Sequence, residues 1–331
     1  MDTGLLGLIF GGLIYAVTTV FSGDFVYYEK VYQPDELLVS EGIAVFAYHE
    51  KWGFAATNGW KVIVPPKYAG VSVFTNGKAL ALTVAGQSNS APKFVRVDKS
   101  GKETPFVLTV PSKVNGKTPV YYSPGDKLHV ISMKPLVMLD GIAADARQVE
   151  VIPSGEQAEI LEMPVAANEI VIAGVPGYWV KVKFSGKTGW VFDGHLSAIE
   201  LTGKMDGVSI KEFLVTLLFG EGKTPSGHIE RFPTGIGYGA YHYTEMDIYS
   251  GKAASLVFVS TEPEAGLLKE FYIYGMRLHE VFRQFESAGF IPAEPKPLMD
   301  GTMIGWEYYE MNLLLESLPG GIVRLKIVYL P

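Results

Sequence analysis

The segment 177–192 constrains the fold of this chain more than any other part of the sequence. Its first half alternates, so that Val180 and Val182 face one side of a predicted strand while Trp179 and Lys181 face the other. A Ser-Gly-Lys turn follows, and a Thr-Gly-Trp-Val-Phe run then returns as the partner strand. The pattern predicts a β-hairpin with one apolar side and one side that carries tryptophan and lysine.

The composition predicts a folded, β-rich chain of more than one domain. A length of 331 residues exceeds what one core usually spans, so two or three domains are expected. Apolar residues make up 48% and charged residues 19%, which excludes a largely disordered chain. The 37 glycines and 20 prolines punctuate runs rich in tyrosine and phenylalanine, a pattern typical of strands joined by turns. We therefore expect a mainly β, multi-domain fold.

Charge and cysteine content exclude several classes of function. The formal net charge is −7 and the chain has no long basic run, so a nucleic-acid backbone would be repelled on average. No nucleic-acid partner is expected. The chain contains no cysteine, which excludes disulfides, thiolate metal sites, a cysteine nucleophile and a lipid-modified cysteine anchor.

The surroundings of the predicted hairpin resemble bacterial SH3 domains. The resemblance rests on a tryptophan strand, a glycine turn, a Gly-Trp-Val strand and a short turn at 193–197 that includes a leucine. Residues 136–139 occupy the place of the family's first strand, and 149–161 match its middle two strands around a glycine turn. The chain departs from the family at Asp140, where an arginine is common, and at 166–175, which is longer than usual.

The resemblance implies a small SH3-like barrel at about residues 136–201 that binds cell-wall peptides or other proteins. Flat aromatic rings give contact area at little entropic cost, so Tyr178, Trp179 and Trp190 are the candidate ligand-binding residues. The alternative is structural, with at least one tryptophan filling the interior of the barrel.

A shorter stretch at roughly residues 45–105 resembles the bacterial WG (KWG) repeat. Lys51-Trp52-Gly53-Phe54, then Gly59, then an isoleucine-proline segment at 62–68 follow the family's order of strand, glycine turn and connection. A degenerate copy without the Trp-Gly pair follows at 94–102. Such repeats are normally tandem, and one good copy departs from that pattern. Trp52 is a further candidate contact residue, although packing of a small β-sheet is the favoured explanation for these aromatics.

The N-terminal segment predicts a place in the cell envelope. Residues 4–21 carry no charge and are long enough to cross a hydrocarbon core as a helix. The first basic residue is Lys30, and small residues that suit a cleavage site occur at Ser22-Gly23. We expect residues 4–22 to be a membrane anchor or signal peptide. A buried or interfacial element is the alternative.

The C-terminal third carries the clearest helical patterns and predicts an α+β domain. Ser209-Ile210-Lys211-Glu212 forms a capping box that opens an apolar stripe, with Gly220 as the stop. A second helix over 278–285 is expected to end near Gly289. Residues 306–315 and 322–330 flank Pro319-Gly320-Gly321 as a terminal hairpin. Residues 271–274 fit a strand or part of a longer helix.

The sequence offers little for catalysis. It lacks a Gly-x-Ser-x-Gly elbow, a His-Glu-x-x-His motif, a phosphate-binding loop and a dinucleotide fingerprint. The run 235–239 is rich in glycine but lacks the lysine and flanking elements of a phosphate loop, so we interpret it as a flexible aromatic loop, either mobile or a contact surface. One polar cluster could ligate a metal if its side chains were brought together: His228, Glu230, His242, Glu245 and Asp247. Because His242 has the opposite strand parity to Glu245 and Asp247, no catalytic or metal site is expected.

Together these patterns predict an apolar segment at 1–23, a WG-repeat-like domain at 24–119, an SH3-like barrel at 120–201 and an α+β domain at 202–331. The expected function is a non-catalytic bacterial envelope protein that holds cell-wall peptides or protein partners, and use as a scaffold subunit of a membrane or surface assembly fits as well as wall binding. It would contact the membrane through residues 4–22 and need no cofactor. The alternative is a cell-wall hydrolase with its active site in residues 202–331.

Overall fold

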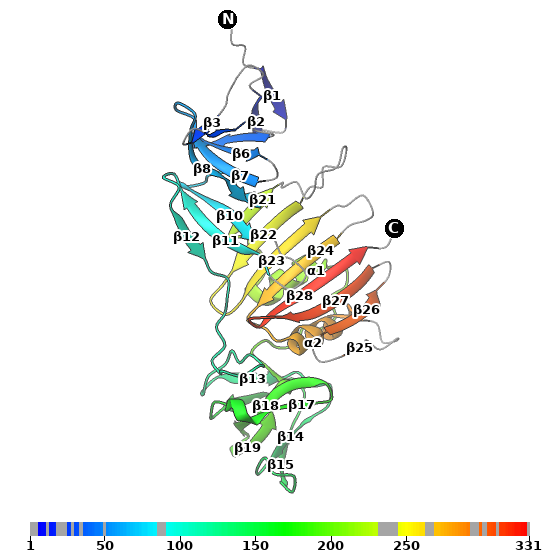
Figure 1. Cartoon of the computed structure of the whole chain (residues 1–331). Coiled ribbons are helices and arrows are strands. Elements are labelled where there is room, and N and C mark those ends of the chain that lie inside the picture. Colours follow the sequence, from blue (N-terminus) through cyan, green and yellow to red (C-terminus); the bar gives the residue numbers. More distant parts are fainter. Residues whose placement is uncertain are drawn as a thin grey trace, which may run out of the picture. The chain divides into compact units, whose positions relative to one another are not determined.

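The structure is a computed structural model and the fold is mainly β, with several antiparallel sheets and, in the part described, two α-helices (Figure 1). It describes residues 6–10, 13–17, 25–27, 30–32, 36–48, 51–84, 91–230, 244–261, 268–291, 298–299, 303–308 and 311–329. The expected glycine-rich loop at 235–239 and His242 lie outside these residues.

The chain divides into two compact units. Unit 1 contains residues 1–107, 225–248 and 259–267, and unit 2 contains residues 108–224, 249–258 and 268–331. This division differs from the three predicted domains, because unit 2 holds 120–201 together with most of the C-terminal third. Strands β22 (Thr244–Ser250) and β23 (Ser255–Thr261) are each shared between the two units.

Unit 1 is built from strands alone in its described part. Its sheets follow the orders β4-β3-β8-β7-β6-β5 and β12-β11-β10-β9, and β1 pairs with β2 and β21 with β22. The strands are β1 (Leu6–Phe10), β2 (Leu13–Val17), β3 (Phe25–Tyr27), β4 (Lys30–Tyr32), β5 (Glu36–Ser40), β6 (Ile43–Tyr48), β7 (Lys51–Ala56), β8 (Lys61–Tyr68), β9 (Gly70–Val71), β10 (Lys78–Val84), β11 (Lys93–Asp98), β12 (Glu103–Phe106), β21 (Gly227–Glu230) and β22 (Thr244–Ser250).

The N-terminal apolar segment contains paired strands where its length predicts a helix. Strands β1 and β2 are antiparallel, with Phe10 opposite Leu13 and Leu6 opposite Val17. The glycines and β-branched residues of this segment have low helix propensity, which agrees with strands. Among the described residues, neither helix has the length and apolar character required to span a bilayer.

The Trp-Gly pair of the WG-like segment has a packing role on β7. Trp52 is buried in one core with Phe54, Tyr68 and Phe74. A Cβ atom on Gly53 would lie 2.6 Å from the Val64 carbonyl oxygen, so only glycine permits β8 to approach this closely. Trp52 is therefore part of the hydrophobic core that packs against the sheet and exposes almost no surface to a partner, as the packing explanation expects.

The first part of unit 2, residues 120–201, is called the central module below. Its strands follow the order β15-β14-β19-β18-β16-β13-β20, and β17 pairs with β18. The elements are β13 (Lys127–Val130), β14 (Leu136–Leu139), β15 (Gln148–Ile152), β16 (Gln157–Ile160), the 3₁₀ turn η1 (Ala166–Asn168), β17 (Glu169–Ile172), β18 (Val175–Phe184), β19 (Lys187–Phe192), the 3₁₀ turn η2 (Asp193–His195) and β20 (Leu196–Ser197).

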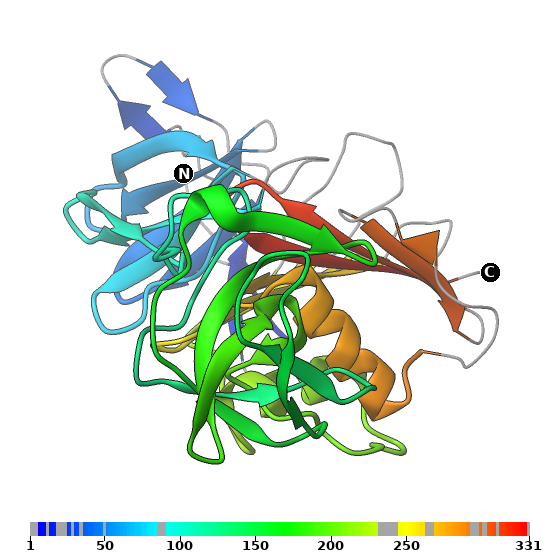
Figure 2. The same ribbon diagram turned by 90° about the horizontal axis from the view of Figure 1, so that it is seen from below.

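The predicted hairpin at 177–192 is confirmed. Strands β18 and β19 pair antiparallel from Trp179↔Phe192 to Phe184↔Lys187, and the hairpin is drawn in green in Figure 2. Ser185 and Gly186 at the turn both have positive φ, of 48° and 79°, as a two-residue hairpin turn with right-handed strand twist requires. Val180, Val182 and Val191 point into the buried core of the central module.

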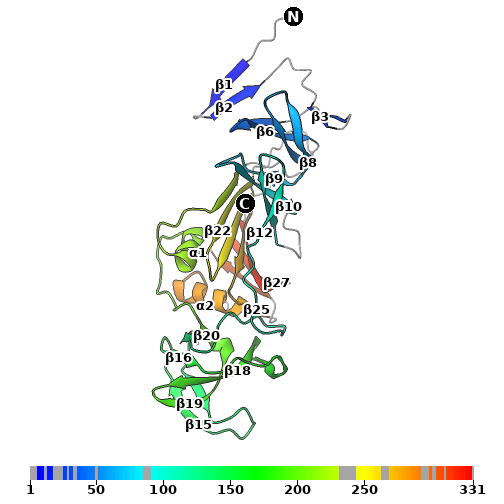
Figure 3. The same ribbon diagram turned by 90° about the vertical axis from the view of Figure 1, so that its left-hand side faces the viewer.

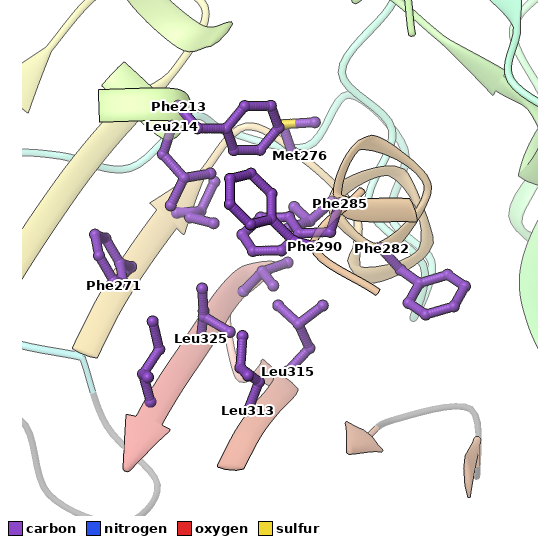
Figure 4. Close-up of a cluster of buried hydrophobic side chains, with 14 of the residues drawn as sticks. Phe213, Leu214, Phe271, Met276, Phe282, Phe285, Phe290, Leu313, Leu315 and Leu325 are labelled. Atoms are coloured by element: carbon purple, nitrogen blue, oxygen red, sulfur yellow. The ribbon is translucent and has the colours of Figure 1, made fainter. Parts of the chain in front are cut away.

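The rest of unit 2 places two helices on one face of an antiparallel sheet (Figure 3). The helices are α1 (Ile210–Phe219) and α2 (Leu278–Ala288). The sheet is eight-stranded, with the order β21-β22-β23-β24-β28-β27-β26-β25, and the strands that lie wholly in unit 2 are β24 (Leu268–Tyr274), β28 (Ile322–Tyr329), β27 (Met311–Leu318), β26 (Met303–Tyr308) and β25 (Leu298–Met299). Figure 4 shows that side chains of both helices meet those of β27 and β28 in one apolar core; among them are Phe213, Leu214, Phe282, Phe285, Leu313, Leu315 and Leu325.

Most local predictions in the C-terminal third are confirmed. The Ser209 hydroxyl accepts the Glu212 amide hydrogen at 3.1 Å and caps α1, which ends at Gly220. Helix α2 ends at Gly289. The terminal hairpin is present as β27 and β28. Residues 271–274 belong to a strand, and 306–315 belong to two strands, β26 and β27, where a single one was predicted.

Candidate functional site

The two tryptophans of the central module lie on the outward side of its hairpin. Trp179 and Trp190 are half-buried, whereas the intervening Val180 and Val191 are buried. Trp190 lies opposite Lys181 on β18 and opposite Leu139 on β14. The Trp179 ring packs edge-on against Phe192, with a centroid separation of 6.5 Å. The alternation predicted the outward side for Trp179, and the pairing of Trp190 with Lys181 places the second indole on the same side. The alternative, in which at least one of the two tryptophans fills the interior of the module, differs from this placement.

Tyr178, the third predicted contact residue of the module, is fully buried. Its hydroxyl donates to the Thr118 carbonyl oxygen at 2.9 Å, and its backbone N–H donates to Asp193 Oδ1 at 2.6 Å. Burial raises the pKa of Tyr178 to about 12. The side chain holds the module together and presents no surface to a ligand. The sequence contained a signal for this burial, because Tyr178 and Val180 are two residues apart and therefore face the same side of the strand.

An apolar outer face surrounds Trp190. We define the outer face as Val137, Leu139, Val151, Trp179, Lys181 and Trp190. Val137 on β14 is 42% exposed and lies opposite the half-buried Val151 on β15. The Lys181 ammonium contacts Glu162 Oε1 at 2.9 Å at the border of the face. The result is a patch in which indole and aliphatic groups reach solvent beside a basic group.

A polar groove of about 520 Å³ begins two residues farther along the same side of β18. Lys183 on β18 and Glu159 on β16 lie opposite each other in it, so the groove carries both signs of charge. Gln157 Nε2 and His129 Nε2 are 2.8 Å apart at its edge. The groove was not predicted, because no strand was expected at 127–130, although the Lys-Leu-His-Val alternation there is typical of a strand.

A buried carboxylate, Asp193, fixes the closing turn of the central module. Its Oδ2 accepts the Tyr122 hydroxyl at 2.7 Å and Arg277 Nη1 at 3.0 Å. Arg277 Nη2 also donates to the Asp193 carbonyl oxygen at 2.9 Å. Because Arg277 precedes α2, this cluster joins the module to the helical layer of unit 2.

Arg277 is itself buried and is surrounded by acceptors. Its Nη2 donates to the Leu196 carbonyl oxygen at 3.0 Å, and its backbone N–H donates to Glu280 Oε2 at 2.7 Å. Burial alone would lower the pKa of Arg277, but the charges of Asp193 and Glu280 raise it. Burial raises the pKa of Glu280 against the attraction of the guanidinium. The cluster is a buried ionic network, in which Asp193 is fully buried and Arg277 and Glu280 are nearly so.

Two histidines beside this network predict acid sensitivity. Burial lowers the pKa of His279 well below its usual value, with added repulsion from Arg277, and burial also lowers the pKa of His195. A histidine whose folded pKa is depressed contributes its full stability above the unfolded pKa of about 6.5 and loses it as the pH falls below that value. We expect the free energy of unfolding, measured by urea denaturation, to fall as the pH drops from 7.5 to 5.5. The fully buried His279 contributes up to ~1.4 kcal/mol per pH unit, and the partly exposed His195 contributes less.

His279→Leu tests this expectation. Among the described residues, His279 Nε2 is buried without a hydrogen-bond partner, so leucine removes a titrating group at little other cost. The variant should show a shallower loss of stability on acidification than the wild type. Equal pH profiles for the two proteins would contradict the assignment. The raised pKa of Glu280 acts in the opposite direction and is common to both proteins.

Three residues of the polar cluster that sequence analysis set aside come together in unit 1. His228 on β21 lies opposite Asp247 on β22, with His228 Nδ1 at 2.6 Å from Asp247 Oδ1. His228, Glu245 and Asp247 each place a ligand atom within 4.8 Å of the other two. Glu230 lies opposite Glu245 in the register. Parity correctly grouped Glu245 with Asp247, but the pairing of β21 with β22 was not foreseen.

Comparison with known proteins gives this chain no family. No protein-family model and no curated protein matches it. A solved structure described as the N-terminal domain of Nup159 aligns with 91% of this chain and 77% of that chain, at 6% identity and a TM-score of 0.20. A likeness at that level carries no conclusion about fold or function.

Proposed function

We propose that this chain is a non-catalytic binding protein whose central module is an SH3-like barrel that holds an extended peptide on its outer face. The observation that carries the proposal is the outward placement of Trp179 and Trp190 beside exposed aliphatic groups. Indole rings are frequent energetic anchors at binding surfaces, because they bury a large area with few rotatable bonds.

The chemistry of the surface points to a peptide that carries carboxylates. Lys181 borders the outer face, and Lys183 continues on the same side of β18 into the mixed-charge groove. Apolar side chains of a peptide would lie on the indoles, while its charged groups would meet the lysines and Glu159. A cell-wall peptide has this character, and so does an acidic segment of a protein partner.

The proposal includes a place in the bacterial cell envelope. The uncharged segment at 4–22 and the resemblance to wall-binding modules support it. The WG-like segment of unit 1 would then act as a spacer in a membrane or surface assembly. This role requires no cofactor.

Trp190→Ala should reduce retention of the full chain on purified wall sacculi by about 10–30-fold, as expected for loss of an aromatic anchor worth ~1.4–2 kcal/mol. Trp179→Ala should act in the same direction. Retention is measured by cosedimentation over a range of sacculus concentrations. Phe106→Ala, a partly buried aromatic on β12 of unit 1, is the matched control and should bind like the wild type.

A second measurement separates a wall ligand from a protein partner. A photo-reactive residue at position 137 of the outer face is irradiated in cells, and the adducts are identified by mass spectrometry. Wall fragments or a protein adduct that disappears in Trp190→Ala supports the outer face as the binding surface. Unchanged sacculus retention in both tryptophan variants, with no adduct at position 137, would remove the proposal.

A further inference from the structure

We infer that His228, Glu245 and Asp247 form a binding site for a divalent transition metal of the zinc type. The inference goes beyond the proposed function and concerns unit 1 alone. It rests on a juxtaposition of one imidazole and two carboxylates from neighbouring strands, β21 and β22.

The strand register creates this donor set. His228 lies directly opposite Asp247, and Glu245 is two residues before Asp247 on the same side of β22. Side chains at i and i+2 of a strand share a face, and directly paired residues have neighbouring Cβ atoms. The backbone pairing of the hairpin therefore holds all three side chains on one face.

The distances are close to those of a metal site. The three ligand atoms lie within 4.8 Å of one another. Zinc binds nitrogen and oxygen ligands at about 2.0–2.2 Å in tetrahedral geometry, which places two ligands of one ion roughly 3.3–3.6 Å apart. Rotation about side-chain bonds covers the remaining difference. The His228–Asp247 hydrogen bond of 2.6 Å would give way to two bonds to the shared cation.

The cluster combines one buried ligand with two exposed ligands, an arrangement in which a bound ion can exchange with solvent. The Asp247 side chain is 5% exposed, whereas the His228 side chain is 42% exposed. Glu245 is also exposed. The buried Asp247 carboxylate would bind the ion on its protein side. The exposed His228 and Glu245 would bind it on its solvent side, where a water molecule can complete the coordination.

The donor types select the class of metal. An imidazole ligand suits zinc and neighbouring transition metals, whereas magnesium and calcium prefer sites made of oxygen alone. Two carboxylates neutralise the double charge of the cation. We therefore expect a site with three protein ligands for Zn²⁺ or Co²⁺, and no competition from Mg²⁺.

Isothermal titration of the untagged, chelator-treated full chain with Zn²⁺ tests the inference. We expect saturable binding of one ion, weakened at least 10-fold in His228→Ala and in Glu245→Gln. His129→Ala, which removes a histidine of unit 2, is the matched control and should bind Zn²⁺ like the wild type. Excess Mg²⁺ should not displace the zinc.

Glu245→Gln carries most weight, because Glu245 is exposed and its substitution leaves the buried Asp247 untouched. Circular dichroism of each variant establishes that it is folded. Co²⁺ added to the wild type should give visible d–d absorption bands that are lost in both ligand variants. Absence of saturable zinc binding in the wild type, or wild-type zinc affinity in His228→Ala or Glu245→Gln, would overturn the inference. Displacement by Mg²⁺ would overturn the choice of metal class.

Discussion

Arg277→Met is expected to destabilise the chain by about 3–5 kcal/mol, because it leaves the buried Asp193 carboxylate without its counter-ion. Methionine preserves most of the apolar volume of the arginine side chain. The decrease in the free energy of unfolding is therefore due to the missing charge and its hydrogen bonds. Tyr122 and the Tyr178 amide would remain as donors to Asp193, but neither carries a positive charge. Urea unfolding followed by intrinsic fluorescence measures the change.

Arg283→Met is the matched control for this prediction. Arg283 pairs with Glu286 on the same helix, but the two side chains are 25% and 32% exposed. An ion pair that water reaches contributes little, so we expect a loss of less than about 1 kcal/mol. If both variants lose the same stability, the buried network does not hold the central module to α2.

The double variant Asp193→Asn, Arg277→Met adds a test of coupling. Neutralising the carboxylate removes the uncompensated charge that the single substitution leaves behind. The double variant should therefore be less destabilised than the sum of the two single variants, by about 1–3 kcal/mol. Additive losses would mean that the two side chains act independently.

This network also marks the limit of what the sequence predicted. Asp193 and Arg277 are 84 residues apart in the chain, and no periodicity or turn signal links them. By contrast, the hairpin at 177–192 was predicted with its turn, because alternation and the Ser-Gly turn are local properties. Helix α1 was predicted for the same reason, since its capping residues are three positions apart.

The same distinction between local and long-range signals applies to the candidate binding residues. Alternation gave the outward direction of Trp179 on β18, whereas the direction of Trp190 on β19 follows from its pairing with Lys181, which the sequence alone did not specify. Alternation did not predict whether Trp52 is buried. Strand β7 packs against a hydrophobic core on each of its two faces, so a side chain on either face is buried. The pairing of His228 with Asp247 depends on a strand register across residues 231–243, which no local pattern specifies.

Gly53→Ala is expected to destabilise unit 1 by about 3 kcal/mol or more, through overpacking against backbone. The new Cβ atom would lie 2.6 Å from the Val64 carbonyl oxygen and 2.8 Å from the Pro66 nitrogen. Backbone atoms of a paired strand cannot rotate away as a side chain does, so β7 and β8 would have to separate. Trp52, which precedes this glycine, would then lose part of its buried contact.

Gly141→Ala is the control, since a Cβ at that position meets no atom within 4 Å and its φ is not positive. Alanine there should be neutral or stabilise the chain by a few tenths of a kcal/mol, by restricting the unfolded state. Thermal unfolding of both variants, with limited proteolysis to locate the weakened region, gives the comparison. Early cleavage within residues 51–68 of Gly53→Ala alone would establish that the Trp-Gly pair serves the packing of this sheet. Equal melting temperatures of the two variants would show that β8 tolerates a side chain at position 53, and the structural explanation of the WG-like motif would fail.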